Sequence, residues 1–267
     1  MENSQLTFLK LGGSLITDKH KARTAQRNVL ARLAGEIASA LEEDPGLRLV
    51  LGHGSGSYGH VAAKKFKTYD GVLTPFDWHG FTEVWKDARQ LNEIVINALT
   101  QAGLPVIAFP ASALVTTAKR AVLHWETETL EKALSHGIIP VVQGDVVFDT
   151  LLGGTILSTE DQFFHLTTRL EPQRILLAGI EPGVWADYPA CTQLLERIRL
   201  SDYAEIKSSL GFSSGIDVTG GMTQKVTRML DVIQAHPNLE IRIFSGTESG
   251  KLKNTLLGAA NGTHISI

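Results

Sequence analysis

The residues whose types and spacing most directly suggest chemistry lie at positions 53–60, in the sequence HGSGSYGH. This stretch follows the apolar run Leu47–Leu51, which predicts a buried strand, and precedes a helix-like segment that begins near Val61. Its glycines would let backbone N–H groups approach an anion closely, and His60 would stand where the helix starts. Taken alone, the stretch fits a tight turn between strand and helix equally well.

Lysines stand beside two further glycine pairs. Lys10 ends an apolar strand-like segment and directly precedes Gly12–Gly13. Lys225 follows the pair Gly220–Gly221. Phosphoryl transfer depends mainly on fixed positive charge around the migrating group, which two such lysines would supply. Most lysines are solvated surface charges, but a charge at the end of an apolar strand is costly without a partner, and this favours a site at Lys10.

The composition is that of an ordinary globular protein, since 43% of its 267 residues are hydrophobic and 20% are charged. A net charge of −3 gives no broad electrostatic footprint for nucleic acid or for an anionic membrane. Cys191 is the only cysteine, which excludes an internal disulfide, and we expect it to be inert. Because the sequence has no signal peptide and no apolar run near about 18 residues, we expect a cytoplasmic protein.

Strand-like and helix-like segments alternate along the chain, which predicts an α/β fold with a mainly parallel sheet covered by helices. We expect one continuous domain with two lobes that meet near residues 170–175. The predicted strands are 6–11, 47–51, 106–109, 138–142, 174–178 and 241–244, and the predicted helices are 27–43, 81–102 and 127–135.

Glycine-rich or acidic turns follow five of the apolar strands. Ligands of open α/β sheets bind outside the carboxyl ends of the strands, where helix N-termini offer free N–H groups. Several such turns at one edge could hold more than one phosphate group, which points to nucleotide-dependent chemistry. The chain has neither a Walker A sequence nor a Rossmann fingerprint. The five turns are 12–14, 52–59, 144–145, 179–183 and Gly246.

Taken in order, these motifs resemble those of the amino acid kinase superfamily. The segment KLGGS at 10–14, followed by ITDK at 16–19, is similar to the opening of that superfamily. The stretch 53–60 matches the pattern HGxGS(F/Y)GH of its isopentenyl phosphate kinases. Segments 144–147, 158–161, 217–225 and 246–265 also match in order, so the resemblance covers nearly the whole chain.

The resemblance implies a three-layer αβα sandwich that forms a single domain over residues 1–267. Residues 1–172 would bind the phosphate acceptor, and residues 173–267 would bind ATP. The implied reaction converts ATP and isopentenyl phosphate into ADP and isopentenyl diphosphate, an isoprenoid building block. The resemblance further implies Mg²⁺, held mostly by phosphates and water, and a homodimer.

The resemblance also implies roles for individual residues. Two lysines would stabilise the migrating phosphoryl group, and Asp161 would orient them, with the neighbouring Glu160 left open as an alternative. The implied catalytic residues are Lys10, His60, Asp161 and Lys225. The implied ATP contacts are Lys10, Gly12, Gly13, Lys19, Gly56, Asp161, Gly183, Gly221 and Lys225. The implied acceptor contacts are Ser55, Gly59, His60 and Gly144.

His60 carries the argument for a phosphate acceptor. A protonated imidazole would add positive charge and a directed donor beside a phosphate dianion, and the dianion should raise the pKa of His60. The structural alternative is a histidine that bonds the backbone at the start of the helix. We expect His53 to pack inside the turn, and the pair lacks the context of a zinc site.

The predicted helix at 81–102 offers Phe81, Val84 and Trp85 as an apolar wall for the acceptor's hydrocarbon tail, although aromatics at helical spacing are more often plain core. Residues 179–185 read GIEPGVW where the family commonly has an acidic residue and Asp-Gly-Val-Tyr, and Tyr58 replaces the commoner phenylalanine. Two other hypotheses remain open. One is a related small-molecule kinase similar to fosfomycin kinase, and the other is a non-catalytic nucleotide-binding protein on this fold.

Overall fold

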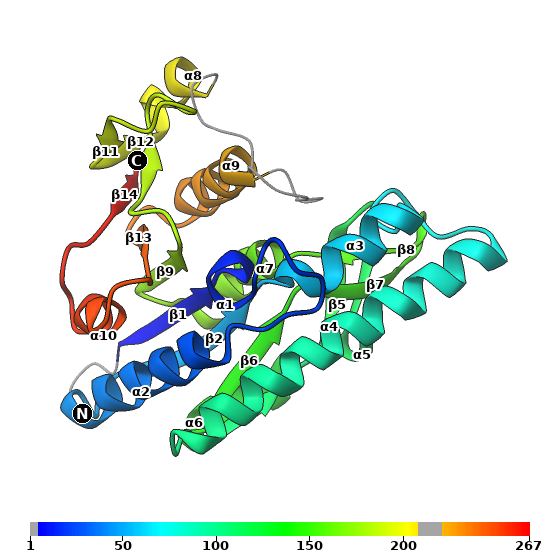
Figure 1. The fold of residues 1–267 in the computed structure, drawn as a ribbon, viewed down its shortest axis with the longest axis horizontal. Coiled ribbons are helices and arrows are strands. Elements are labelled where there is room, and N and C mark those ends of the chain that lie inside the picture. Colours follow the sequence, from blue (N-terminus) through cyan, green and yellow to red (C-terminus); the bar gives the residue numbers. More distant parts are fainter. Residues whose placement is uncertain (1–4, 208–220) are drawn as a thin grey trace.

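A computed structural model of the chain describes residues 5–207 and 221–267, without the side chain of His60. In this part of the chain, eight strands form one sheet in the order β12-β14-β13-β9-β1-β2-β6-β3 (Figure 1). The strands are β1 (Leu6–Leu11), β2 (Arg48–His53), β3 (Val106–Ala108), β6 (Ile139–Gln143), β9 (Arg174–Gly179), β12 (Arg197–Arg199), β13 (Glu240–Ser245) and β14 (Thr263–Ser266).

Six neighbouring strands of this sheet, from β3 through β6, β2, β1 and β9 to β13, run parallel. β14 pairs antiparallel with β13 and carries β12 at its other edge. The mainly parallel sheet expected from the sequence is therefore confirmed. Because the strands are parallel, the turns that follow β1, β2, β6, β9 and β13 all lie at one edge.

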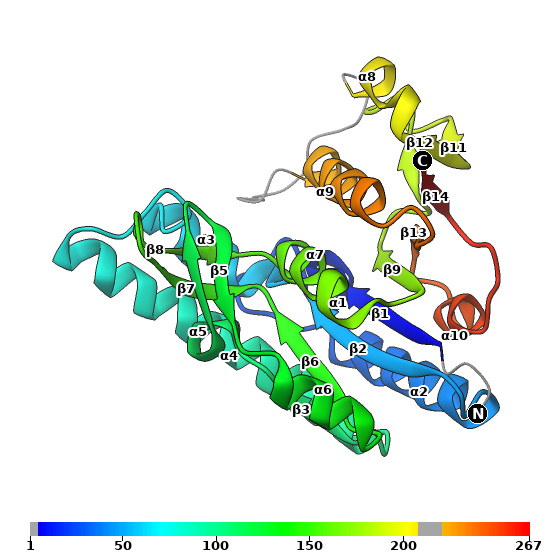
Figure 2. The ribbon, with the colours of Figure 1, turned by 180° about the vertical axis from the view of Figure 1, so that it is seen from behind.

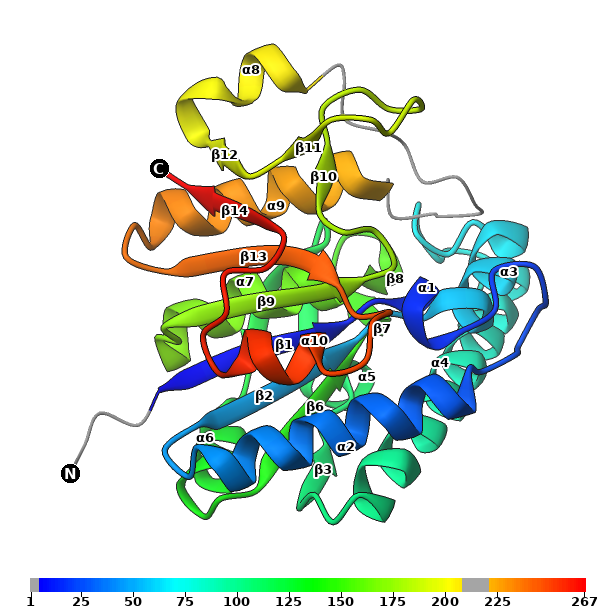
Figure 3. The same cartoon turned by 60° about the vertical axis from the view of Figure 1, so that its left-hand side comes forward.

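Alternate side chains of the strands enter two cores on opposite faces of the sheet. Phe8 and Val50 face a core that includes Phe163 and Met229 of the helices on that side. Leu9 belongs to the other core. Figure 3 shows α2 and α10 in front of the sheet, with α7 and α9 behind it. These layers form the expected αβα sandwich, with helices α2 (Arg27–Glu43), α4 (Pro75–Gln101), α6 (Glu128–Ser135), α7 (Thr159–Leu170), α9 (Gly221–Ala235) and α10 (Lys251–Leu256).

A second sheet, in the order β5-β4-β7-β8, was not predicted from the sequence. It lies beside α3 (Gly56–Phe66) and α4 (Figure 2). Val146 and Ile156 of this sheet join Phe66 and Phe81 of the two helices in a third apolar cluster. Its strands are β4 (Val115–Ala118), β5 (Ala121–Trp125), β7 (Asp145–Asp149) and β8 (Gly153–Leu157). The remaining elements are α1 (Gly13–Ile16), α3 (Gly56–Phe66), α5 (Ala111–Leu114), β10 (Val184–Trp185), β11 (Leu194–Leu195), the 3₁₀ turn at Leu200–Asp202 and α8 (Tyr203–Ile206).

Two helices begin earlier than predicted. α4 starts at Pro75 because Thr74 and Asp77 form a capping box, in which the Asp77 amide donates to the Thr74 hydroxyl at 3.2 Å and the Thr74 amide donates to the Asp77 carboxylate at 2.9 Å. α3 starts at Gly56 rather than near Val61. The large sheet continues from β1 to β9, so the division into lobes at 172/173 stays a prediction. None of the described helices is both long and apolar enough to cross a membrane.

Candidate active site

The turns at the carboxyl edge of the large sheet surround a cavity of about 830 Å³. The first turns of α7 and α9 complete its wall. Two of the predicted positions, Gly59 and Gly183, do not line the cavity, and the side chain of His60 lies outside the described part of the chain. The predicted site residues that do line it are Lys10, Gly12, Gly13, Lys19, Ser55, Gly56, Gly144, Asp161, Gly221 and Lys225.

The turn after β1 and the turn after β2 touch each other through glycine. A Cβ added to Gly13 would overlap the backbone nitrogen of Gly56, and one added to Gly54 would come within 2.8 Å of the Gly13 nitrogen. Gly56 has φ +50, which favours glycine as well. Thr17 ties the same turns together, because its hydroxyl donates to the Gly13 carbonyl at 2.7 Å and accepts from the Ser57 amide at 3.0 Å. These glycines therefore serve the close approach of two loops as well as an open backbone for anions.

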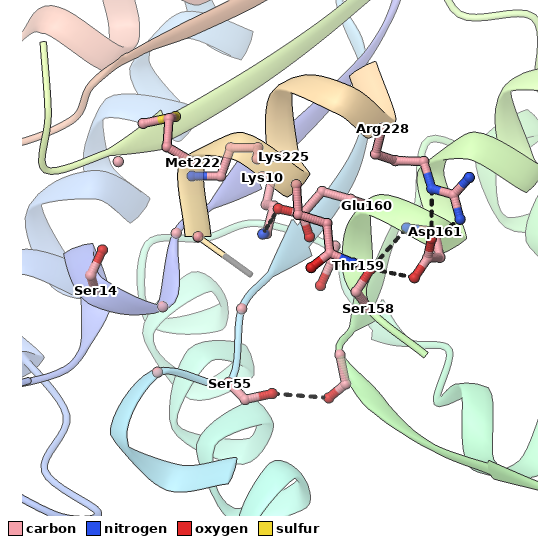
Figure 4. A pocket seen from close by; sticks show the side chains of 18 of the residues that line it. Lys10, Ser14, Ser55, Ser158, Thr159, Glu160, Asp161, Met222, Lys225 and Arg228 are labelled. Atoms are coloured by element: carbon pink, nitrogen blue, oxygen red, sulfur yellow. Dashed lines mark hydrogen bonds and ion pairs between the residues drawn. The ribbon is translucent and has the colours of Figure 1, made fainter. Parts of the chain in front are cut away.

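Lys10 and Glu160 form an ion pair at the centre of the cavity wall (Figure 4). Lys10 is the fifth residue of β1, and Glu160 lies in the first turn of α7, which Ser158 caps. The two side chains are only 10% and 14% exposed. Burial raises the pKa of Glu160, but the positive charges of Lys10 and Lys225 outweigh burial and hold this pKa below its ordinary value. Glu160 is therefore an anion held between two lysines that come from opposite ends of the sequence.

Asp161, which was expected to orient the lysines, turns away from them. One of its carboxylate oxygens accepts from Arg228 Nε at 2.7 Å, and the other accepts from the Ser158 hydroxyl at 2.7 Å. Consecutive residues of an α-helix point about 100° apart, so only one of two adjacent acids can face Lys10. The geometry thus corrects the placement and selects Glu160 as the acid beside Lys10.

Ser55 and Gly144 lie together where β6 passes into β7. The Ser55 hydroxyl donates to the Gly144 carbonyl at 3.3 Å, and both residues line the cavity as expected. Gly59 instead packs against Ser55, since a Cβ there would come within 2.8 Å of the Ser55 Cβ. Gly183 packs on β14, where a Cβ would overlap the Thr263 hydroxyl. The direct ligand contacts expected for Gly59 and Gly183 are therefore not supported by this geometry.

His53 packs inside the turn, as the sequence indicated. Its ring is buried, with Nε2 3.0 Å from Asn92 Oδ1 and Nδ1 3.1 Å from the Gly54 carbonyl oxygen. Burial lowers the pKa of His53, so the ring is neutral at pH 7. His53 thus supports the loop and contributes no charge to the cavity.

The apolar part of the cavity comes from residues that the sequence did not single out. Phe81 and Val84 lie inside the third apolar cluster and do not line the cavity, so these two candidates on α4 are plain core, the commoner of the two interpretations. Val61, Tyr69 and Ile156 line it instead. Ile156 belongs to the sheet that was not predicted, and for that reason its position could not be anticipated.

A loop over residues 18–24 carries Lys19 to the cavity wall. Arg23 fixes this loop to α4 through a two-pronged ion pair with the buried Asp87, at 2.8 Å from Nε and 3.1 Å from Nη2. The Arg23 amide also donates to the Ser57 carbonyl at 3.1 Å. Local sequence patterns contain no signal for this anchor, because Arg23 and Asp87 are 64 positions apart.

Beyond β9, the cavity is bordered by Glu181, Trp185, Tyr188 and Cys191. The Trp185 indole nitrogen donates to the Glu181 carboxylate at 2.9 Å, which fixes the loop that departs from the family pattern. Burial and the charge of Glu181 raise the pKa of the Cys191 thiol, so the thiol stays protonated at neutral pH. Its inertness remains a prediction.

Comparisons with known proteins agree with this geometry. The sequence profile of the amino acid kinase family matches residues 5–245. The chain is 32% identical to an isopentenyl phosphate kinase of Methanocaldococcus jannaschii over 97% of its length and 98% of that protein. It is 31% identical to an isopentenyl phosphate kinase of Methanothermobacter thermautotrophicus over 98% of its length and 99% of that protein. A crystal structure of an isopentenyl phosphate kinase, 28% identical, superposes with a TM-score of 0.82 over 98% of this chain and all of that one. The resemblance stated from the sequence is thereby confirmed, and the chain belongs to the amino acid kinase family.

Proposed function

We propose that this chain is an isopentenyl phosphate kinase, a phosphotransferase that passes the γ-phosphoryl group of ATP to the phosphate of isopentenyl phosphate. The observation that carries the proposal is the placement of Lys10, Glu160 and Lys225 on the wall of one cavity. Near-full-length relatives named isopentenyl phosphate kinase support the choice of acceptor. The products would be isopentenyl diphosphate and ADP.

The acceptor would bind at the wall formed by the turn after β2. Ser55 and Gly144 offer polar groups there, and the helix α3 begins at the same place with Gly56. Val61 and Ile156 supply an apolar surface for a short hydrocarbon tail. His60 follows one turn into α3, and we propose that its imidazole binds the acceptor phosphate.

The two lysines would act on the migrating phosphoryl group. Negative charge spreads over its equatorial oxygens in the transition state, and ammonium groups fixed around them lower the barrier without forming a covalent bond. Glu160 would hold Lys10 by direct contact and attract Lys225 electrostatically. Lys19, on its anchored loop, would add a further contact to the ATP phosphates.

ATP would extend from the lysines toward Glu181 and Trp185, with Gly12, Gly13 and Gly221 near its phosphates. In the described part of the chain, no group of three or more acidic, histidine or cysteine side chains is placed to hold a metal ion. We therefore propose that Mg²⁺ enters with ATP, coordinated by phosphate oxygens and water. A homodimer and a cytoplasmic location remain predictions.

The decisive experiment compares acceptors. The protein is incubated with ATP and Mg²⁺ and with isopentenyl phosphate, dimethylallyl phosphate, fosfomycin or N-acetylglutamate, while ADP release and product mass are measured. We expect diphosphate formation from isopentenyl phosphate. Failure of the folded protein to turn over isopentenyl phosphate would refute the proposal. Turnover of fosfomycin in its place would identify a related small-molecule kinase, and ATP binding without any turnover would identify a non-catalytic nucleotide-binding protein.

A further inference from the structure

The first turn of α7 presents two adjacent acids, and each engages a different cation. Glu160 contacts Lys10 of β1, whereas Asp161 contacts Arg228 of α9 (Figure 4). The Ser158 cap fixes this turn, because its hydroxyl bonds both the amide and the carboxylate of Asp161. The beginning of α7 therefore connects the strand that carries one active-site lysine to the helix that carries the other.

Several contacts hold the Arg228 guanidinium in one orientation. Its Nε and Nη2 both bond the same oxygen of Asp161. Its flat face lies over the Phe164 ring, 4.9 Å from the ring centroid, and its Nη1 is 3.5 Å from Asp231. Because its guanidinium group is restrained in this way, Arg228 holds α9 against α7 more rigidly than a mobile surface lysine would.

Arg228 and Lys225 are three residues apart on α9, so they project from the same side of the helix. The neighbouring face of α9 enters the core through apolar residues such as Met229 and Ile233. Apolar packing is non-directional, and it opposes separation more strongly than a small rotation or slide. The bond to Asp161 supplies the directional restraint that this packing lacks.

We propose that the Asp161–Arg228 ion pair is a positioning pair for phosphoryl transfer, which fixes α9 in the register that sets Lys225 beside Glu160. This inference rests on the proposed function of the site. It assigns Asp161 a role that differs from the one implied by the resemblance, because Asp161 acts on Lys225 through Arg228 rather than by touching a lysine.

The pair should matter far more for the rate than for stability. Its side chains are 22% and 34% exposed, and ion pairs that water reaches contribute little to folding. A displacement of about 1 Å in a group that stabilises the transition state can nevertheless cost roughly 10²-fold in rate. A positioning role therefore predicts a loss of kcat with little change in Tm.

The test is a double-mutant cycle between Arg228 and Lys225. We expect Arg228→Ala to lower kcat roughly tenfold, because Lys225 loses its fixed place. In a Lys225→Ala background the same change should cost much less than tenfold, since no lysine remains to be positioned. Asp161→Asn should reproduce the effect of Arg228→Ala, and Arg228→Lys should recover part of the rate. The proposal would be overturned if Arg228→Ala lowered kcat by the same factor in the parent protein and in the Lys225→Ala background.

Two further measurements separate this role from its alternatives. Lys253→Ala removes an ion pair with Glu43 (2.7 Å) between α10 and α2, and it should leave kcat unchanged. If Asp161→Asn has no effect while Arg228→Ala does, then Arg228 contacts the nucleotide itself and the positioning pair is refuted.

ATP affinity, measured by calorimetry on the same variants, needs no acceptor. If the parent protein fails to phosphorylate isopentenyl phosphate, the proposed function fails on its own. The ATP affinities of the parent, the two single variants and the double variant would still test the inference. If the effects of Arg228→Ala and Lys225→Ala on ATP affinity were simply additive in free energy, the inference would be overturned.

Discussion

Lys10 Nζ lies against the carboxylate of Glu160, and the pair joins a strand that begins at residue 6 to a helix that begins at residue 159. Both side chains are largely buried, yet they border an open cavity. A buried ion pair of this kind is a poor source of stability, because removing two charges from water offsets most of their attraction. The ion pair instead holds the Lys10 ammonium group in a fixed position in the site.

Glu160→Gln should lower kcat by roughly 10²-fold, because Lys10 and Lys225 would no longer be held around a common anion. The KM for the acceptor should change much less, since the Glu160 side chain pairs with Lys10 and lies apart from Ser55 (Figure 4). Steady-state kinetics on both substrates would show this split. Glu248→Gln serves as the control, because its carboxylate pairs with Lys251 on the surface. A kcat within twofold of the parent would contradict the assignment.

Lys10→Ala and Lys225→Ala should each lower kcat by roughly 10²-fold or more through lost transition-state stabilisation. Neither change disturbs the apolar cores, but Lys10→Ala should also lower Tm, because it leaves the largely buried Glu160 without its direct partner. Single-turnover rates with saturating ATP would separate the chemical step from binding. A loss confined to the KM for ATP would show that these lysines only bind the nucleotide.

The strongly patterned elements could be predicted from the sequence. β1 and α2 have the bounds that their apolar patterns indicated, and the parallel order followed from the alternation of strands and helices. The second sheet was missed at Asp145, which looked like a turn residue after β6. Asp145 in fact begins β7 as a buried acid, whose carboxylate accepts from the Ser112 and Val146 amides. The Ser112 amide comes close to Asp145 only in the folded chain, so a local sequence pattern does not indicate this partner.

The candidate site could likewise be predicted only in part, because local patterns indicated some of its residues and missed others. Lys10 was identified because a charge at the end of an apolar strand needs a partner, and that partner is Glu160. Arg228 was not identified, because an arginine three residues after Lys225 looks like an ordinary solvated helix residue. Its partner lies 67 positions away, so only the folded chain shows that the two belong together.

His60→Ala should weaken isopentenyl phosphate binding much more than ATP binding. The reason comes from the sequence, since a histidine in a turn that binds the acceptor would add a donor, and a charge when protonated, beside the phosphate dianion. His60→Gln tests whether a neutral donor is sufficient. Dissociation constants for both ligands would decide, and equal losses for the two would show that His60 supports the fold instead.

Asp149 should make the β4–β5 turn sensitive to acid. Although burial raises the pKa of Asp149, hydrogen bonds from the Arg120 and Leu151 amides and from Thr117 hold it far below its ordinary value. Since the folded-state pKa is lowered, its contribution to stability is full above the unfolded pKa of about 3.9 and falls as the pH drops below that value.

Asp149→Asn should therefore destabilise the protein by about 2–3 kcal/mol at pH 7, because a buried acceptor of several bonds loses its charge. The difference in Tm between variant and parent should shrink below about pH 4, where the Asp149 carboxylate of the unfolded chain begins to protonate while that of the folded chain stays charged. Thermal unfolding between pH 7 and pH 3 measures this, and a Tm difference that does not change with pH would contradict the role of the charge.

Gly13→Ala should abolish most of the activity and lower Tm. The added Cβ would overlap the Gly56 nitrogen and come within 2.7 Å of the Gly56 Cα, and backbone cannot give way as a flexible side chain could. The turns after β1 and β2 would separate, which would move Lys10 away from the Ser55 side of the cavity. Gly35→Ala is the matched control, since nothing lies within 4 Å of a Cβ at that exposed position in α2. Alanine there should stabilise the helix by about 1 kcal/mol and leave kcat unchanged. A Gly13→Ala variant with parental kcat and Tm would show that the two turns do not need this close contact.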